Sequence, residues 1–311
     1  MKKNSKIYVA GGQSGLVGKA LVSHLKEKGY TNIIVKTRKQ LDLLNQKKVD
    51  TFFKMEKPEY VFLAAAKVGG ILANKTQKAD FLYENLAIQN NVIYSAWKYK
   101  VKKLLFLGSS CIYPRLAPQP MKEEYLLTGK PEETNDAYAI AKIAGVMLCQ
   151  NFNKQYKTNF ISLVPTNLYG PNDNFDYETS HVVPVLIRKF HEAKLKKNKD
   201  VVVWGSGKAY REFLYVDDLA EACIFLMKSY NDSEIINVGT GEDITIKDLA
   251  KLIKKIVGFE GKISWDRLKP DGAPRKKLDV SKLNKLGWRS MTNLSEGIEL
   301  TYKWCLKNKV F

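Results

Sequence analysis

The chain has 311 residues, of which 51 are basic and 32 acidic, and its formal net charge is +19. With 45% hydrophobic and 11% aromatic residues it can bury a sizeable core, which excludes an intrinsically disordered chain. A membrane-spanning helix needs ~20 apolar residues, and the longest apolar runs, such as residues 60–66, are far shorter. We therefore expect one large domain or two interlocked ones, with no membrane segment.

The N-terminal segment and the cysteines bear on the compartment. Apolar residues 7–10 form too short a stretch for a signal peptide. The four cysteines lack the paired spacing of a disulfide framework or a zinc site; they are Cys111, Cys149, Cys223 and Cys305. These features predict a cytoplasmic protein without a metal site.

The excess of positive charge comes from lysine. Only seven of the basic residues are arginine and the remaining 44 are lysine, whereas nucleic-acid readers rely on arginine for bidentate base contacts. No groove-reading motif accompanies the charge. We therefore expect a solvated, lysine-rich surface and no nucleic-acid partner.

Short apolar runs alternate with longer stretches of helical spacing along the chain. The expected strands are residues 6–10, 32–35, 60–65, 103–108, 160–164, 201–204 and 235–238. The expected helices are residues 16–28, 80–98, 136–156 and 183–195. This alternation predicts an α/β fold with a Rossmann-type doubly wound parallel sheet covered on both faces.

The alternation loosens after Gly170, where loops at residues 171–180 and 269–277 interrupt it. We read this change as the start of a smaller α+β lobe that binds substrate. The expected Rossmann domain comprises residues 1–170 plus about 212–240. The expected substrate lobe comprises about 171–211 plus 241–311.

A glycine-rich loop follows the first expected strand. Gly12, Gly15 and Gly18 fit the pattern G-x-x-G-x-x-G of short-chain dehydrogenases/reductases. Glycine lets the backbone turn sharply and approach a pyrophosphate at a helix N-terminus, where N–H groups and the helix dipole favour anions. A glycine triplet alone could be a tight structural turn, but the strand–loop–helix context favours dinucleotide binding.

The residues after the second expected strand indicate which dinucleotide binds. NAD-binding folds usually place an Asp or Glu there to hold the ribose 2′-hydroxyl, but this chain reads Lys-Thr-Arg-Lys-Gln at residues 36–40. Arg38 can hold a 2′-phosphate bidentately, which a carboxylate would repel. The sequence therefore predicts NADPH, although these charges could simply face solvent.

A candidate catalytic trio lies in the middle of the chain. Tyr138 and Lys142 fit Y-x-x-x-K and share one helix face, and Ser109 ends the strand before them. Two further pairs with this spacing, at Tyr94 and Tyr99, precede that strand and suit the role poorly. Since ligands bind at the carboxyl ends of parallel strands, Ser109 and Tyr138 are expected to meet over the nicotinamide.

The acidity of the trio suggests its roles. A free phenol has a pKa near 10, and we expect the Lys142 ammonium to lower the pKa of Tyr138. Tyr138 would then give a proton to a carbonyl oxygen while NADPH gives a hydride to the carbon. Ser109 would hydrogen-bond the same oxygen.

Together these motifs resemble GDP-L-fucose synthase, a family of NADPH-dependent 3,5-epimerase-4-reductases acting on GDP-4-keto-6-deoxy-D-mannose. The resemblance covers essentially the whole chain, but Lys189 stands where the family commonly has an arginine. The matching segments are residues 108–114, 138–142, 167–171, 180–182, 202–207, 211–218 and 269–276.

The resemblance implies roles for Cys111 and His181. The C3 and C5 protons of a 4-keto sugar lie α to a carbonyl, so a base can remove them if the enolate oxygen is stabilised. Cys111 resembles the family's base and His181 its acid, and Ser109 and Tyr138 would hold the enolate oxygen. The thiol, with a reference pKa of about 8.5, needs only a modest lowering of its pKa.

Further contacts and a dimer are expected on the same grounds. The substrate contacts are Asn167, Val182, Lys189, Trp204, Arg211 and Asp271. Besides Arg38 and the three glycines, the cofactor contacts are Gln13, Ser14, Leu16, Val17, Lys39, Asp42, Leu43, Leu107, Gly108, Lys142, Pro165, Asn167, Leu168 and His181. The helices at residues 80–98 and 136–156 resemble the pair that forms a four-helix bundle in homodimeric reductases.

Other functions stay open. The nearest is a C4-reductase with little or no epimerisation, acting on another GDP-4-keto hexose or heptose in surface-polysaccharide biosynthesis. Dehydration is disfavoured, because related dehydratases carry Thr-Asp-Glu where this chain has Ser-Ser-Cys at residues 109–111. The intact Ser109, Tyr138 and Lys142 trio also argues against a non-enzymatic NADP-binding regulator.

Overall fold

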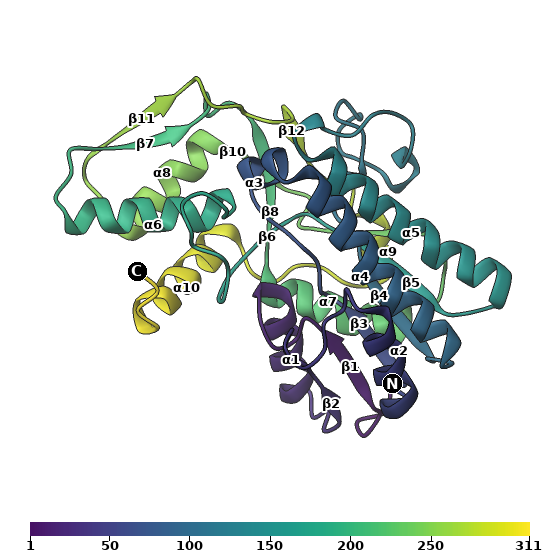
Figure 1. Cartoon of the computed structure of the whole chain (residues 1–311). Helices are drawn as coiled ribbons and strands as arrows, with labels where there is room; N and C mark the ends of the chain where they lie inside the picture. The colour runs from purple at the N-terminus through teal and green to yellow at the C-terminus, as the bar shows by residue number, and fades with distance from the viewer.

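The computed structural model describes all 311 residues, and a six-stranded parallel sheet lies at its centre (Figure 1). The strands follow the order β2-β1-β3-β4-β5-β9. Their bounds are β1 (Ile7–Ala10), β2 (Ile33–Ile34), β3 (Tyr60–Leu63), β4 (Lys103–Leu107), β5 (Phe160–Pro165) and β9 (Ile236–Val238). The order changes direction between β1 and β3, the point at which doubly wound sheets bind ligands. The predicted α/β Rossmann class is confirmed.

The apolar strands of this sheet are buried on both faces. Ile7 and Val9 of β1 pack with α1 (Leu16–Glu27) and α7 (Val216–Ser229). Tyr8 and Ala10 point the other way, towards α2 (Gln46–Glu56), α4 (Lys78–Lys98) and α5 (Asp136–Tyr156). Because successive side chains of a strand alternate between faces, both must be apolar when helices cover both.

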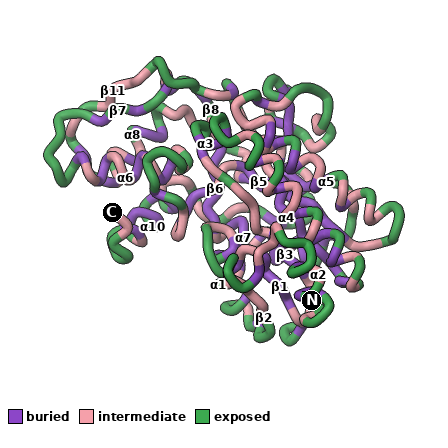
Figure 2. Tube along the Cα trace, in the orientation of Figure 1, coloured by how far each residue is buried: buried purple, intermediate pink, exposed green.

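The smaller lobe contains short strands and three helices (Figure 1, upper left). Strand β8 (Tyr210–Tyr215) pairs with β6 (Asn167–Tyr169), β10 (Asp243–Thr245) and β12 (Arg275–Lys276), while β7 (Asp200–Trp204) pairs with β11 (Lys262–Asp266). Helices α6 (Val182–Leu195), α8 (Ile246–Val257) and α10 (Leu294–Lys307) enclose their own apolar cluster. Buried segments, purple in Figure 2, therefore run through both lobes.

Five short helical segments complete the chain. They are α3 (Ile71–Thr76), α9 (Ser281–Lys285) and 3₁₀ turns at Ser110–Ile112, Glu123–Tyr125 and Glu133–Asn135. Helix α9 packs on β9, and Leu283 and Trp288 join the apolar core around α1 and α7.

The expected strands and helices are present, but their grouping differs in detail. Strand β7 pairs with β11 in the smaller lobe and β9 lies in the central sheet. The expected ranges place residues 201–204 in the substrate lobe and residues 235–238 in the Rossmann domain. Strand β8 crosses the expected boundary at residue 212, and α9 packs with the Rossmann core rather than with the substrate lobe. Local spacing predicts an element but not its distant partner. The proposed domain division therefore stays a prediction.

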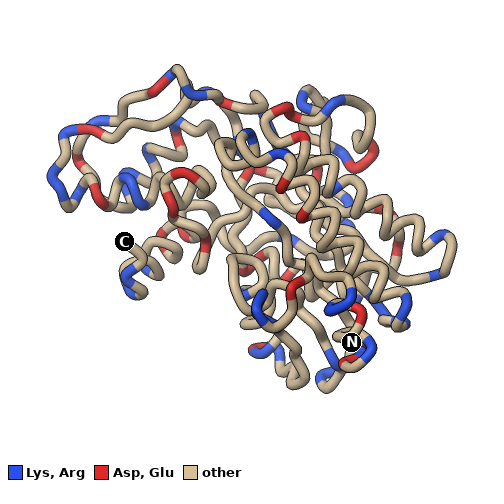
Figure 3. The backbone as a smooth tube through the Cα atoms, in the orientation of Figure 1, with Lys and Arg blue, Asp and Glu red and all other residues tan.

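Basic residues are spread over both lobes and alternate with acidic ones (Figure 3). None of the helices combines the length and the apolar character needed to cross a membrane.

Candidate active site

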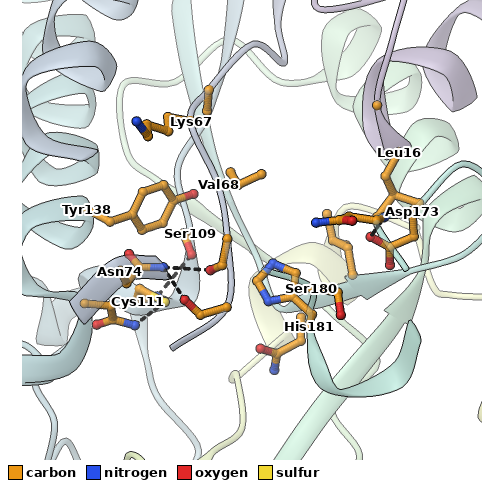
Figure 4. Close-up of a pocket in the computed structure, with 18 of the residues that line it drawn as sticks. Leu16, Lys67, Val68, Asn74, Ser109, Cys111, Tyr138, Asp173, Ser180 and His181 are labelled. Atoms are coloured by element: carbon orange, nitrogen blue, oxygen red, sulfur yellow. Dashed lines mark hydrogen bonds between the residues drawn. The ribbon is translucent and has the colours of Figure 1, made fainter. Parts of the chain in front are cut away.

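A cavity of about 900 Å³ lies where the carboxyl ends of the central strands face the smaller lobe. Gly11, Ala64, Gly108 and Thr166, each directly after or close behind a strand of the sheet, line it. Residues of α6 and of the loop before β12 close the other side. Figure 4 shows Tyr138, Ser109 and Cys111 together on one wall, with His181 across from them.

The glycine loop leads directly into α1. Gly11 and Gly15 have positive φ values of +86° and +84°, and a Cβ on Gly15 would meet nothing within 4 Å. A Cβ on Gly18 would lie 1.9 Å from the Gly11 carbonyl oxygen, so only glycine lets loop and helix pack this closely. Helix α1 has no side-chain cap and no acidic residue in its first turn. Its N–H groups are therefore available to an anion.

Most of the predicted cofactor contacts line the cavity. They are Ser14, Gly15, Leu16, Val17, Gly18, Arg38, Asp42, Leu43, Leu107, Gly108, Lys142, Pro165, Asn167, Leu168 and His181.

Three of the predicted cofactor contacts do not line the cavity. Gly12 is buried, and a Cβ there would come within 2.7 Å of the Val35 side chain. Gly12 therefore allows the helix and the sheet to pack closely, whereas Gly11 has the positive φ of the turn. Gln13 and Lys39 are exposed to solvent. Arg38 is exposed over 74% of its side chain and lies 3.8 Å from Glu84, so its guanidinium is largely free.

Ser109, Tyr138 and Lys142 line the cavity together, as the sequence predicts. Ser109 follows β4 and accepts a hydrogen bond from the Cys111 backbone N–H at 3.3 Å. Lys142 lies one turn after Tyr138 on α5; its Nζ is 5.7 Å from the centroid of the Tyr138 ring and donates to the Leu107 carbonyl oxygen at 2.8 Å. The α5 spacing thus places phenol and amine beside the end of β4.

The expectation that the pKa of Tyr138 is lowered is wrong in direction. Burial raises the pKa of Tyr138, and the negative charge of Cys111 adds to the increase. Burial also lowers the pKa of Lys142 to about 7, which weakens its charge. The sequence shows the neighbouring lysine but not the desolvation, which here dominates. The phenol therefore stays protonated at neutral pH.

Cys111 has the lowered pKa that a base requires. Burial alone would raise the pKa of its thiol, but the charge of Lys276, hydrogen bonds from Ser109 and Lys276, and the charge of Arg211 together lower it. Lys276 Nζ lies 3.5 Å and Asn135 Nδ2 3.2 Å from Sγ. Both donate hydrogen bonds that favour the thiolate.

His181 occupies the N-cap position of α6, on the side of the cavity formed by the smaller lobe. Surrounding protein atoms lower the pKa of its imidazole, so the neutral form predominates at pH 7. The loop before it is tied to the opposite lobe, because the Gly70 N–H donates to the Thr179 carbonyl oxygen at 2.9 Å. A Cβ on Gly70 would lie 2.5 Å from the Ser180 carbonyl oxygen.

Several of the predicted substrate contacts are held by backbone and side-chain hydrogen bonds within the smaller lobe. Lys189 donates to the Val202 carbonyl oxygen at 2.9 Å, and its Nζ lies 5.8 Å from the Trp204 ring centroid. Arg211 donates to the Asp271 carbonyl oxygen at 2.9 Å, and the Asp271 carboxylate accepts from the Ser206 N–H and hydroxyl. All six predicted contacts line the cavity: Asn167, Val182, Lys189, Trp204, Arg211 and Asp271.

Several lining residues have no role predicted from the sequence. Lys276 stands at the end of the matching segment 269–276, and Glu132 and Asn135 precede the helix of Tyr138. The segment between β3 and α3 also lines the cavity. Its Ala-Ala-Ala-Lys-Val-Gly-Gly sequence directly after a strand was a signal that could have identified it.

Comparison with known proteins agrees with this geometry. A family profile described as NAD dependent epimerase/dehydratase family matches residues 7–239. GDP-L-fucose synthase 1 of Arabidopsis thaliana is 58% identical over 306 residues, which cover 98% of this chain and 94% of the relative.

Two solved structures share the fold. A GDP-6-OMe-4-keto-L-xylo-heptose reductase from C. jejuni superposes with a TM-score of 0.96 at 43% identity, covering 99% of both chains. A GDP-L-fucose synthetase from Naegleria fowleri bound to NADP has a TM-score of 0.91 at 31% identity, covering 100% of this chain and 96% of that one. The chain belongs to the NAD dependent epimerase/dehydratase family and, within it, to the GDP-L-fucose synthase family.

Proposed function

We propose that this protein converts GDP-4-keto-6-deoxy-D-mannose to GDP-L-fucose with NADPH, by epimerising C3 and C5 and then reducing the C4 ketone. The observation that carries the proposal is the placement of Ser109, Cys111, Tyr138 and His181 on the walls of one cavity. Cys111 and His181 suit the removal and return of a proton. Ser109 and Tyr138 suit hydrogen bonding to a carbonyl oxygen. The 58% identity to a GDP-L-fucose synthase supports this substrate.

The residues around the glycine loop fit NADPH. The space beside Gly15 and the uncapped start of α1 would accept the pyrophosphate. Lys36 and Arg38 line the cavity after β2 and would hold the 2′-phosphate. Bound there, NADPH supplies the hydride for the reduction at C4. The NADP bound by the Naegleria relative supports the same choice.

Epimerisation needs a base, an acid and a site for the enolate oxygen. The Cys111 thiolate would take the proton from C3 or C5 to form the thiol, and the electron pair of the C–H bond would move to the C4 oxygen as an enolate. Ser109 and the protonated Tyr138 would hydrogen-bond this oxygen. His181, in the minority protonated form that its lowered pKa allows, would return a proton to the opposite face of the carbon.

Reduction uses the same oxygen-binding pair. As hydride reaches C4, the carbonyl oxygen gains negative charge, and Tyr138 would transfer its phenolic proton to it. The phenol carries its proton at neutral pH, and it is a stronger acid than the alcohol that forms at C4, so the transfer is downhill once the hydride has added. Lys142, fixed by the Leu107 carbonyl, would hold the cofactor beside the phenol.

The GDP moiety would occupy the other end of the cavity. Lys189 and Arg211 would pair with the diphosphate, and the exposed Trp204 indole would stack on the base. Asp271 and Asn167 would accept or donate hydrogen bonds to the sugar or guanine.

We also propose a homodimer in the cytoplasm. Helices α4 and α5 lie side by side (Figure 1), and their outer faces expose the apolar side chains of Tyr83, Tyr94, Ile140 and Met147. Pairing with the same helices of a second copy would form a four-helix bundle. Sedimentation at micromolar concentration should give the dimer mass, and a monomer would contradict this assignment.

The substrate can be tested by isotope exchange. The purified protein is incubated with NADPH and GDP-4-keto-6-deoxy-mannose in D₂O, and the product is examined by NMR. Deuterium at C3 and C5 of an L-galacto sugar is the expected result. Cys111→Ala should stop exchange but spare reduction of a pre-epimerised ketone, and equal loss of both activities would contradict the division of roles.

A reductase with little or no epimerisation is the second candidate, because the C. jejuni heptose reductase shares 43% identity over nearly the whole chain. The two candidate functions predict different deuterium uptake in this assay. Reduction without deuterium uptake would identify this activity, and no turnover of the hexose would direct the assay to a GDP-4-keto heptose.

A further inference from the structure

The Cys111 thiol faces two cations from neighbouring strands of the smaller lobe. Lys276 of β12 pairs in register with Arg211 of β8, and both side chains line the cavity. Lys276 Nζ is 3.5 Å from Sγ, although 165 residues separate them in the chain. Arg211 donates to backbone carbonyl oxygens of Tyr210 and Asp271, so its charge is not cancelled by an ion pair.

The backbone around Lys276 is held on both sides. Arg275 forms two hydrogen bonds to the Asp243 carboxylate, at 2.6 and 3.0 Å. The Lys277 N–H donates to Gln119, and the Leu278 N–H donates to the buried Glu212 carboxylate at 2.7 Å. Lys276 is therefore a half-buried amine on a fixed strand rather than a mobile surface lysine. These contacts fix the point on the backbone from which the Lys276 side chain reaches the thiol.

No other group around the Cys111 thiol places a positive charge in contact with Sγ. Ser109 and Asn135 also offer hydrogen bonds to Cys111. Tyr138 on α5 is protonated because burial raises its pKa. Glu132 forms an ion pair with Arg115 at 3.1 Å, and His181, mostly neutral, lies across the cavity. Lys276 is the cation in direct contact with Sγ.

We propose that Lys276 activates Cys111, so that its ammonium keeps the thiol ionised and directed into the cavity as the base for proton removal. Lys276 is then a positioning residue for epimerisation, and reduction at C4 does not need it for proton transfer. The role of the thiolate in epimerisation rests on the proposed function. The ionisation of the thiol by Lys276 does not, because it can be measured without any substrate.

The test is the pH dependence of alkylation by iodoacetamide. Cys111 is partly exposed while Cys149, Cys223 and Cys305 are buried, and mass spectrometry of the labelled peptide confirms the site. Lys276→Met should raise the apparent pKa of the thiol by about one unit and slow alkylation at pH 7 about tenfold, because only the thiolate reacts. Lys276→Arg should restore most of the rate. Lys277→Met is the matched control and should leave the profile unchanged.

A Lys276→Met profile that overlays the wild type would overturn the proposal, and so would an equal shift in Lys277→Met. A raised KM for the GDP-sugar with an unchanged thiol profile would identify Lys276 as a diphosphate ligand instead. Deuterium exchange in D₂O separates the two proposals. If the thiol profile shifts but the wild type exchanges no C3 or C5 proton, the activation stands and the epimerase function fails.

Discussion

Glu212 offers the sharpest test of the packing that holds β8 and β12 beside the cavity. Its side chain is completely buried and accepts three backbone hydrogen bonds, from Thr240 and Gly241 at 2.7 and 2.9 Å and from Leu278 at 2.7 Å. Replacing Glu212 by Ala leaves the buried N–H of Leu278 without a partner, at about 1–3 kcal/mol, and the partly buried N–H groups of Thr240 and Gly241, at about 1 kcal/mol each. The change also relieves the cost of burying a carboxylate.

The pKa of Glu212 gives the size of that relief. Burial raises the pKa from 4.5 to about 6, despite the three N–H donors that lower it. A shift of this size makes the ionised form about 2 kcal/mol less favourable in the folded state at pH 7. The net loss in Glu212→Ala is therefore about 2 kcal/mol. It corresponds to a melting temperature about 3 °C lower for a chain of this length.

The pH dependence has a definite sign. Because the folded-state pKa is raised, the native protein binds the proton more tightly than the unfolded chain, so this contribution to stability is present below pH 4.5 and is lost as the pH rises through about 6. The stability gap between wild type and Glu212→Ala should widen by about 1 kcal/mol from pH 7 to pH 5.

Thermal or urea unfolding at pH 7 and pH 5 measures both effects. Glu242→Ala is the control, since Glu242 lies in the same turn with its side chain exposed. A gap that narrows on acidification would mean that the N–H donors outweigh burial and hold the pKa below its usual value. A change of less than 1 °C in Glu212→Ala would refute the hydrogen-bonding argument itself.

Three further changes probe the cavity. Arg38→Ala should raise KM for NADPH about tenfold or more through loss of a charge-assisted contact, and an equal effect on NADH would refute the 2′-phosphate assignment. Tyr138→Phe should lower the rate of C4 reduction by about 10²–10⁴ with unchanged circular dichroism; near-normal turnover would exclude Tyr138 as the acid. Gly18→Ala places a Cβ 1.9 Å from the Gly11 carbonyl oxygen, so NADPH binding measured by fluorescence titration should be lost, and retained affinity would show that the loop can shift.

The parts of the site that could be predicted from the sequence are those formed within one segment. The glycine loop joins a strand to the helix that follows it, and Tyr138 and Lys142 occupy successive turns of α5. Their relative positions follow from the period of the helix and from the rule that ligands bind at strand ends. No knowledge of distant pairing was required.

Contacts between distant segments could not be predicted in the same way. Strand β12 has only two residues, so no periodicity indicates it. Its pairing with β8 and the bridge between Leu278 and Met121 bring Lys276 to Cys111. The wrong direction for the pKa of Tyr138 has a related cause. The lysine one turn away is visible in the sequence, but the burial that raises the pKa arises from the whole fold.

The charge of +19 is a poor guide to function because what matters is how each cation is positioned. On the surface, Lys98 and Lys102 pair with the carboxylates of Asp50 and Glu59, which cancel their charge locally. In the cavity, Lys189 and Arg211 are positioned by neutral backbone carbonyl oxygens. A carbonyl fixes the side chain but leaves its net charge available, and desolvation strengthens that charge towards an anion. Small anionic ligands need such local, uncancelled cations, and a lysine-rich surface screened within about 8 Å does not supply them.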